Sequence, residues 1–229
     1  MRLSLTYFAI THNKPAFAIE TSKNIKELPL KVYYQLRAIE EYMKIMNIGY
    51  KRDFNLSVEE IKTLLKKQEY VVINNNTILP LKGLVKVIKY FPLTSKKITY
   101  FSKDPLVAVV KEKDYYVLYE GNNRLAVIYP QYFNNYCHLK SIEVIVDGKK
   151  RKVNLPSVVD VKDSFEVLGN KRVNVIGYSS KKNESFVKIT KSMLQPKFSI
   201  DVNHSVYRVE IYDKKSFCGM FLVRFKGEK

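Results

Sequence analysis

The order of apolar and polar residues changes its period along the first third of the chain. Residues 3–9 alternate, and after the turn signal Asn13-Lys14-Pro15 the chain returns through the apolar residues 16–19, which predicts an N-terminal β-hairpin. From Pro29 the apolar residues recur every three or four positions, as expected for one stripe of a helix: Val32, Leu36, Ile39, Met43 and Met46. The sequence therefore predicts a hairpin followed by a helix.

The remainder of the chain is richer in strand patterns. A capping box at residues 57–60 begins a second predicted helix, and Pro80 is expected to begin a short third helix. Asp147-Gly148 is a hairpin dipeptide between two apolar runs. Further apolar runs predict strands at 98–101, 106–110, 115–119, 141–146, 152–155, 173–178, 185–189, 206–212 and 217–225.

These patterns predict an α+β protein in three parts. We expect an N-terminal hairpin and helical region at residues 1–73, a central α+β domain at 74–156, and a β-rich C-terminal domain at 157–229. Hydrophobic residues make up 46% of the chain, which is enough to build ordinary cores. No apolar run approaches the roughly 18 uncharged residues of a spanning helix. The N-terminus is too short and too strand-like for a signal peptide, so we expect a cytoplasmic protein.

The two cysteines give no sign of a metal site or of a disulfide framework. Cys137 and Cys218 lie far apart, without a second cysteine or a histidine cluster nearby. We therefore expect two ordinary thiols.

Charge is the global feature that departs most from the ordinary. The chain has 40 Lys and Arg against 22 Asp and Glu, a formal net charge of +18. A positive field attracts polyanions, and nucleic acid is the commonest polyanion in a cell. The excess is spread along the chain, so we expect DNA to bind to folded surfaces without sequence preference. The alternative is a lysine-rich surface that is simply solvated.

One segment carries the candidate chemistry. An apolar strand leads to Glu120, Gly121 permits a sharp turn, and Asn122, Asn123 and Arg124 are expected to open a helix. Free backbone N–H groups at a helix N-terminus, beside an arginine, bind phosphate well. Glu120 would hold Mg²⁺ or accept a proton from an attacking hydroxyl. The alternative is an ordinary turn, with Asn122 as a helix cap and Arg124 paired with Glu120.

This box and its flanking strands resemble the ParB/sulfiredoxin superfamily. Members of that superfamily have a proline-led strand, a strand that ends in an acidic-Gly-x-x-Arg box, a helix and a further strand; the matching stretches here are residues 105–109, 115–127 and 142–146. The resemblance covers roughly residues 77–147. It implies a small α+β domain whose box binds nucleotide phosphates, with Mg²⁺ and a nucleoside di- or triphosphate as cofactors.

Departures from the superfamily pattern narrow the expected chemistry. Asn122 stands where sulfiredoxin has its catalytic cysteine, which argues against that reductase activity. Of the Gly-Glu-Arg-Arg box of chromosome-partition ParB proteins, this chain keeps only the glycine, as Gly121, and the last arginine, as Arg124. The Asp-Gly-His-His-Arg box of the archaeal free serine kinase family is similar in layout to residues 120–124.

These observations lead to three alternative functions. The leading expectation is a DNA-binding ParB-like protein with a phosphate or nucleotide site and nuclease or NTPase activity. The first alternative is a nucleotide-dependent kinase for a small hydroxyl-bearing metabolite, with Glu120 as base. The second is a binding module without catalysis. The sequence leaves open whether the box is catalytic and whether the protein is an oligomer.

Overall fold

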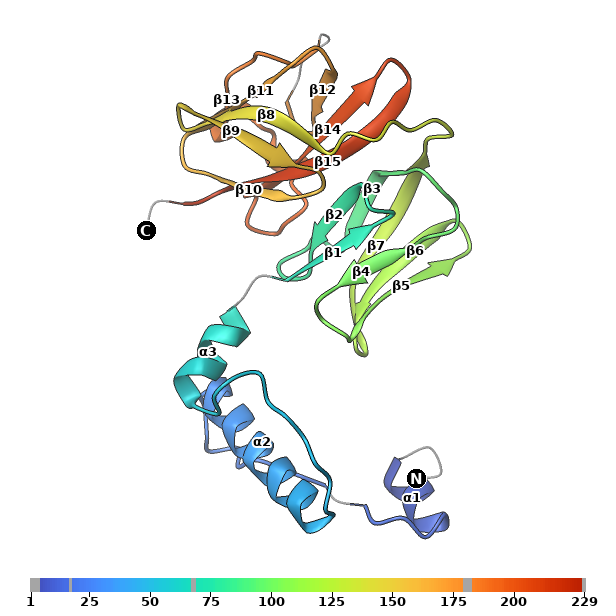
Figure 1. Ribbon diagram of the computed structural model, residues 1–229, viewed down its shortest axis with the longest axis vertical. Coiled ribbons are helices and arrows are strands. Elements are labelled where there is room, and N and C mark those ends of the chain that lie inside the picture. Colours follow the sequence, from blue (N-terminus) through green and yellow to red (C-terminus); the bar gives the residue numbers. More distant parts are fainter. Residues whose placement is uncertain (1–4, 17, 67–68, 179–182, 228–229) are drawn as a thin grey trace. The chain divides into compact units, whose positions relative to one another are not determined.

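The chain forms two compact units, Met1–Lys67 and Gln68–Lys229, of which the first is helical and the second consists almost entirely of strands (Figure 1). The computed structural model describes residues 5–16, 18–66, 69–178 and 183–227. Regular structure is mostly β, so the expectation of an α+β protein with a ParB/sulfiredoxin-like central domain is wrong. The finer division of the chain at residues 73 and 156 stays a prediction.

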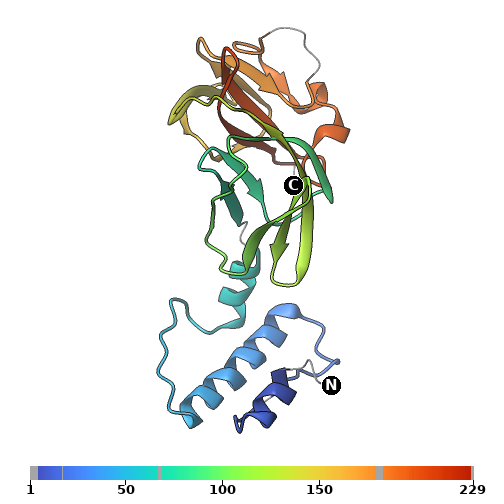
Figure 2. The same cartoon turned by 90° about the vertical axis from the view of Figure 1, so that its right-hand side faces the viewer.

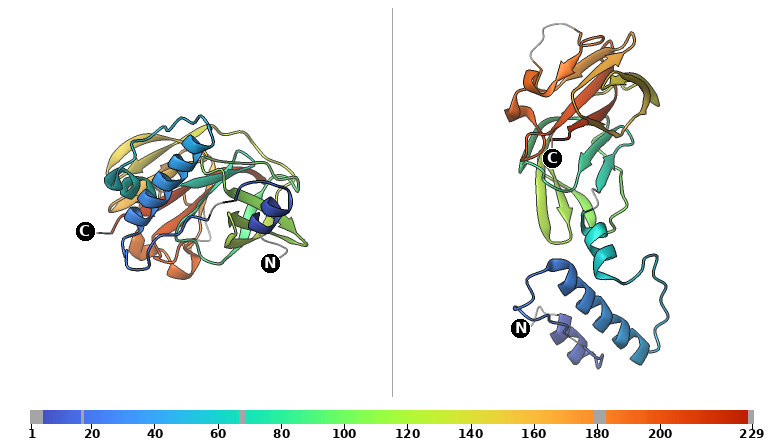
Figure 3. Two further views of the ribbon diagram at one scale, coloured as in Figure 1. Left: turned by 90° about the horizontal axis from the view of Figure 1, so that it is seen from below. Right: turned by 90° about the vertical axis from the view of Figure 1, so that its left-hand side faces the viewer.

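The N-terminal unit contains the helices α1 (Leu5–Thr11), α2 (Leu28–Ile45) and α3 (Val58–Lys66), which can be followed in Figure 3. The two helices that the sequence predicts here are confirmed as α2 and α3. Pro29 lies in the first turn of α2, where its missing N–H is not needed. The hydroxyl oxygen of Ser57 accepts a hydrogen bond of 3.2 Å from the N–H of Glu60 at the start of α3.

The predicted N-terminal hairpin does not form. Residues 5–11 are helical instead, and none of the described residues 12–20 is in a strand; Phe17 lies outside the described residues. A strand needs a neighbour for its backbone groups, whereas a helix pairs them within the segment. No helix of the described residues is long and apolar enough to cross a membrane.

The N-terminal unit has little core of its own. Among its described residues only Glu40 and Ile61 are buried. Arg52 Nε lies 2.6 Å from Glu40 Oε1 and neutralises that carboxylate. The apolar stripe of α2 is only partly covered, and large apolar side chains of this unit are exposed: Ile39, Ile45, Met46, Ile48 and Leu64.

The described residues of the C-terminal unit form four small sheets. Their strand orders are β2-β1-β4, β3-β7-β6-β5, β10-β15-β14-β12 and β13-β11-β8-β9. The elements are β1 (Tyr70–Ile73), β2 (Thr77–Pro80), β3 (Val87–Leu93), β4 (Tyr100–Ser102), β5 (Val107–Glu112), β6 (Tyr115–Glu120), β7 (Asn123–Tyr132), β8 (Ser141–Val146), β9 (Lys149–Asn154), β10 (Val158–Val161), β11 (Ser164–Leu168), β12 (Arg172–Val175), β13 (Ile189–Thr190), η1 (Lys191–Met193), η2 (Pro196–Phe198), β14 (Val206–Asp213) and β15 (Ser216–Phe225).

Strands β14 and β15 form the middle layer of this unit. They pair antiparallel and can be followed as the red strands in Figures 1 and 2. Val206, Met220 and Leu222 belong to one apolar cluster, and the alternate residues Val209 and Phe221 belong to a second. Because side chains alternate along a strand, this hairpin is covered on both faces, which explains its near-continuous apolar sequence.

Local turn signals were more reliable than helix signals in this unit. The β8–β9 hairpin turns at Asp147-Gly148, and both residues have the positive φ that a two-residue hairpin needs, which confirms that prediction. The predicted helix after Pro80 is wrong, because Pro80 ends β2 and the N–H of Leu81 bonds to the carbonyl of Glu69. The predicted thiols are also wrong, because Cys137 and Cys218 form a disulfide.

Candidate functional site

The predicted phosphate-binding box is the turn of a β-hairpin. Glu120 ends β6, Asn123 begins β7, and these two residues pair across the strands. Gly121 has a φ of +56°, as a tight turn requires, and its N–H bonds to the carbonyl of Leu106. The expected helix does not follow, because residues 123–132 are strand β7. The helix N-terminus invoked for phosphate binding is therefore missing.

Phosphate binding by residues 121–124 and a catalytic role for Glu120 stay predictions. Asn122 and Asn123 lie at the tip of the hairpin, and Arg124 follows them on β7, opposite Tyr119. No observation tests a binding role for Gly121 to Arg124 or a catalytic role for Glu120.

Glu120 does meet another carboxyl group. The pairing of β5 with β6 places Val107 opposite Glu120, and Asp104 precedes that strand closely enough to reach it. Burial raises the pKa of Glu120; a hydrogen bond with Asp104 and that residue's negative charge raise it further, against the opposing charge of Lys82. The contact with Asp104 therefore disfavours ionisation of Glu120.

The described residues do not fit a metal centre. Among them, no group of three or more His, Cys, Asp or Glu side chains is arranged to hold a metal ion, and Glu120 with Asp104 makes only a pair. Protein metal centres usually combine three or more such ligands. We assign no metal to Glu120 and derive no step through one.

A cavity of about 630 Å³ lies between two sheets of the C-terminal unit. Strand β3, at the edge of one sheet, provides Lys89 and Tyr90, and strands β12 and β14 of the other sheet provide half of the polar side chains. Lys197 of η2 also lines it. Its volume lies in the range of small-molecule pockets.

Five polar side chains of the cavity come from one face of the β12–β14 sheet. Arg208, Glu210 and Tyr212 alternate along β14 and therefore point to the same side. In register with them on β12, Asn174 lies opposite Glu210 and Arg172 lies opposite Tyr212. The face thus presents two arginines, an amide, a carboxylate and a phenol to the cavity.

Arg208 and Glu210 form the buried part of this face. The two residues are only 5% and 3% exposed, and Arg208 Nη1 lies 3.4 Å from Glu210 Oε1. Tyr212 donates its phenolic hydrogen to Glu210 Oε2 at 2.6 Å. Burial, followed by the negative charge of Glu210, raises the pKa of Tyr212, so the phenol stays a neutral donor. Arg208 Nε and Glu210 Oε1 have no hydrogen-bond partner.

A β-bulge in β3 holds the other side of Arg208. The pairing of β3 with β7 shifts between Ile88 and Phe91, and Tyr90 has a φ of +52°. Arg208 donates to the carbonyl oxygens of Tyr90 at 3.0 Å and Lys89 at 3.3 Å. A bulky residue with positive φ is a genuine outlier, and such strain is often found at functional sites.

Sequence patterns alone did not identify these residues, although one signal was present. Residues 206–212 were correctly predicted as a strand, and polar side chains occupy every second position from 208 to 212. Alternating polar and apolar residues predict a strand with one polar face, which meets either solvent or a cavity. Tyr90 and Lys89 could not be joined to that face from the sequence, because the contact spans about half of the chain.

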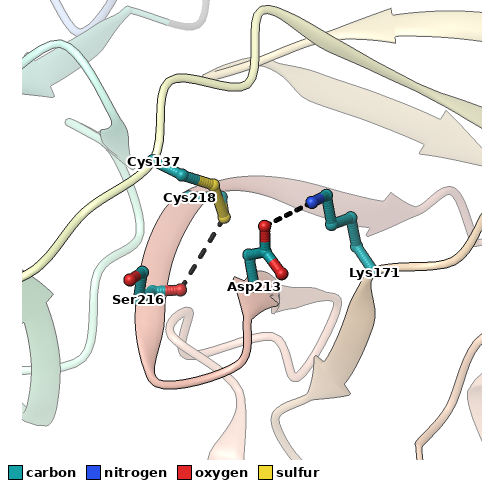
Figure 4. Close-up of a disulfide and its surroundings, with 5 residues drawn as sticks. All are labelled: Cys137, Lys171, Asp213, Ser216 and Cys218. Carbon is teal, nitrogen blue, oxygen red and sulfur yellow. Dashed lines mark hydrogen bonds and ion pairs between the residues drawn. A yellow bond between two sulfur atoms is a disulfide. The ribbon is translucent and has the colours of Figure 1, made fainter.

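The disulfide lies near the turn of the β14–β15 hairpin, at the register shift opposite Ile211 and Tyr212. Cys137 belongs to the segment that follows β7, Cys218 belongs to β15, and their Cα atoms are 4.4 Å apart (Figure 4). The N–H of Cys137 also bonds to the carbonyl of Phe217. Nearby, Lys171 forms an ion pair with Asp213 (Figure 4).

Comparison with protein-family models gives two matches at opposite ends of the chain. Residues 1–66 match the catalytic part of a carboxypeptidase controlling helical cell shape. Residues 135–226 match the C-terminal domain of a metallo-carboxypeptidase. The search of curated proteins gave no match.

Solved structures of the cell shape determinant protein Csd4 from Helicobacter pylori are similar over almost the whole chain. The product-bound form is 35% identical, with a TM-score of 0.74, and the alignment covers 99% of this chain and 56% of Csd4. The tripeptide-bound form is 35% identical, with a TM-score of 0.73 and the same coverage. The mDAP-bound form of Csd4, described as a D,L-carboxypeptidase, is 34% identical, with a TM-score of 0.74 and coverage of 99% and 57%. The chain thus spans little more than half the length of Csd4.

These matches overturn the ParB/sulfiredoxin-like assignment and the functions that followed from it. DNA binding, nuclease or NTPase activity and small-molecule kinase activity are not supported, because the similar proteins are carboxypeptidases. DNA and nucleotide are likewise wrong as partners, since the Csd4 structures hold a tripeptide or mDAP. The matches support a metal ion as cofactor in general terms, but no nucleotide. Over 99% of its length, the chain is similar to a metallo-carboxypeptidase that determines cell shape.

Proposed function

We propose that the chain acts in a metallo-carboxypeptidase that shortens mDAP-containing peptides of the bacterial cell wall and thereby controls cell shape. One observation carries the proposal. Two carboxypeptidase family models match the two ends of the chain in order, and Csd4 aligns across both and across the residues between them.

The substrate class follows from the bound forms of Csd4. A carboxypeptidase removes the last residue of a peptide, and the Csd4 structures include a tripeptide complex, a product complex and an mDAP complex. We infer a tripeptide that ends in mDAP as substrate and free mDAP as one product. The described residues contain no three-ligand metal group, so we assign no hydrolytic step to them.

Deletion of the gene in the producing bacterium tests this function. Mass spectrometry of digested cell wall should show more tripeptides and fewer dipeptides, and the intact gene should restore the original ratio. An unchanged peptide profile, with unchanged cell shape, would contradict the proposal.

We also propose that the protein works in an oxidising compartment. The disulfide between Cys137 and Cys218 supports this location over the predicted cytoplasm, because thiols stay reduced in most cytoplasms. Fractionation of the cells, with thiol alkylation before lysis, would test it. Free thiols at both cysteines in the native protein would count against this location.

A further inference from the structure

We infer that the cavity beside Arg208 binds the carboxylate end of a short peptide. The choice of a peptide among carboxylate ligands rests on the proposed function, whereas the carboxylate itself is argued from the cavity. The C-terminal unit would thus contribute a peptide-binding pocket.

The charges around the cavity favour an anionic ligand. Lys89, Arg172, Lys197 and Arg208 all line it, against the single carboxylate of Glu210. A planar guanidinium matches the two oxygens of a carboxylate, and Arg172 is exposed, stacked over the Tyr212 ring at 5.7 Å. This arrangement leaves the guanidinium of Arg172 accessible to a ligand in the cavity.

The unpartnered polar atoms require a ligand with both acceptors and donors. Arg208 Nε lacks an acceptor, and Glu210 Oε1 has only the 3.4 Å ion-pair contact with Arg208 Nη1 and no hydrogen bond, although both side chains are more than nine-tenths buried. A buried polar atom without a partner costs about 1–3 kcal/mol. A peptide end provides carboxylate oxygens for the arginines and an N–H for Glu210. Inorganic phosphate has no N–H group, and its negative charge would lie against that carboxylate.

The bulge is a second, independent observation at the same place. Tyr90 keeps a positive φ and exposes 73% of its surface at the cavity, instead of packing its ring into the core. Phe198 is also exposed where it lines the cavity. Two exposed aromatic rings beside the polar side chains of the cavity are suited to pack against the apolar parts of residues next to the C-terminus of a peptide.

Isothermal titration of the full chain tests the site with three probes: a tripeptide that ends in mDAP, the same tripeptide with an amidated C-terminus, and inorganic phosphate. We expect the amide to bind about tenfold more weakly than the acid, because it loses charge-assisted hydrogen bonds. Arg172→Gln and Lys197→Gln should each weaken binding of the acid about three- to tenfold. Lys152→Gln removes an exposed charge outside the cavity and should leave affinity unchanged.

Four results would overturn the inference. They are no saturable binding of the tripeptide at millimolar concentration, equal binding of acid and amide, equal affinity of all three variants, and displacement of the tripeptide by equimolar phosphate. The titration follows binding without hydrolysis. Binding of the tripeptide through Arg172, together with an unchanged cell-wall peptide profile after deletion of the gene, would therefore contradict the proposed enzyme function and leave the pocket in place.

Discussion

Removal of the Cys137–Cys218 disulfide should strongly destabilise the C-terminal unit. The bond joins cysteines 81 residues apart, so it closes a loop that includes most of the second half of the chain. In the chain-entropy treatment, a cross-link over a loop of that length lowers the stability of the unfolded state by on the order of 4.5 kcal/mol at 25 °C. Measured losses are usually smaller than this limit, and we expect Cys137→Ser with Cys218→Ser to lose about 3–4 kcal/mol.

Denaturant unfolding followed by far-ultraviolet circular dichroism measures this loss. Tyrosine fluorescence is a second probe, because the chain has 17 tyrosines and no tryptophan. For a unit of this size, 1 kcal/mol corresponds to roughly 2–4 °C in Tm, so the double variant should melt roughly 10 °C lower. Reductant should lower the Tm of the parent protein similarly and leave that of the double variant unchanged.

The reduced parent protein provides the decisive comparison, because Cys218 is buried and a serine hydroxyl there adds its own cost. If the reduced and oxidised parent proteins unfold at the same denaturant concentration, the loop-closure argument is wrong for this protein.

Three further predictions concern single side chains. Burial opposes ionisation of Asp147, but its hydrogen bonds from the backbone N–H groups of residues 162–164 lower its pKa overall. Ionised Asp147 therefore stabilises the fold at pH values above its pKa in the unfolded chain, and this contribution is lost as the pH falls through its pKa in the folded protein. Asp147→Asn should make the free energy of unfolding less dependent on pH in the acid range. The same dependence in the variant and the parent protein would refute this role of Asp147. The raised pKa of Glu120 means that its ionised form destabilises the fold at neutral pH, where it repels Asp104. Glu120→Gln should therefore raise Tm at neutral pH. The difference in Tm between variant and parent protein should vanish in acid. Ser57→Ala should destabilise α3 by about 1 kcal/mol, measured as lost helicity by circular dichroism, whereas Ser57→Asp should retain the cap.

The elements that could be predicted are those whose signal is local. Asp147-Gly148 specifies its own hairpin, because both residues tolerate a positive φ. Helices α2 and α3 were visible from Pro29 and Ser57, which satisfy or avoid free backbone donors at a helix start. Such signals need no knowledge of the remainder of the fold.

The segment after Glu120 was mispredicted because its pattern is ambiguous. A Gly-Asn-Asn turn before Leu125-Ala126-Val127 suits either a helix cap or a hairpin tip. Pairing decides the outcome: β7 is hydrogen-bonded to β6 on one side and to β3 on the other. The resemblance to the ParB/sulfiredoxin superfamily rested on the order of short strands and the box, and that order does not reveal which strands pair.

The cavity was out of reach for a different reason. Its side chains come from β3, β12, β14 and η2, and each is unremarkable in its own segment. Only the sheet topology brings Tyr90 against Arg208, which lies 118 residues further along the chain. The sequence could indicate a polar face on β14, but it could not identify what that face meets.

That polar face is difficult to explain by stability alone. Burying an ion pair such as Arg208 and Glu210 costs desolvation that their attraction does not always offset, and apolar side chains of similar volume often stabilise as well or better. The same strand fills its other face with Val209 and Ile211, so an apolar packing is available to it. The ion pair also depends on a strained bulge at Tyr90 for two of its hydrogen bonds. A buried ion pair, two buried polar atoms without a hydrogen bond, and backbone strain together are more readily explained by ligand binding than by packing.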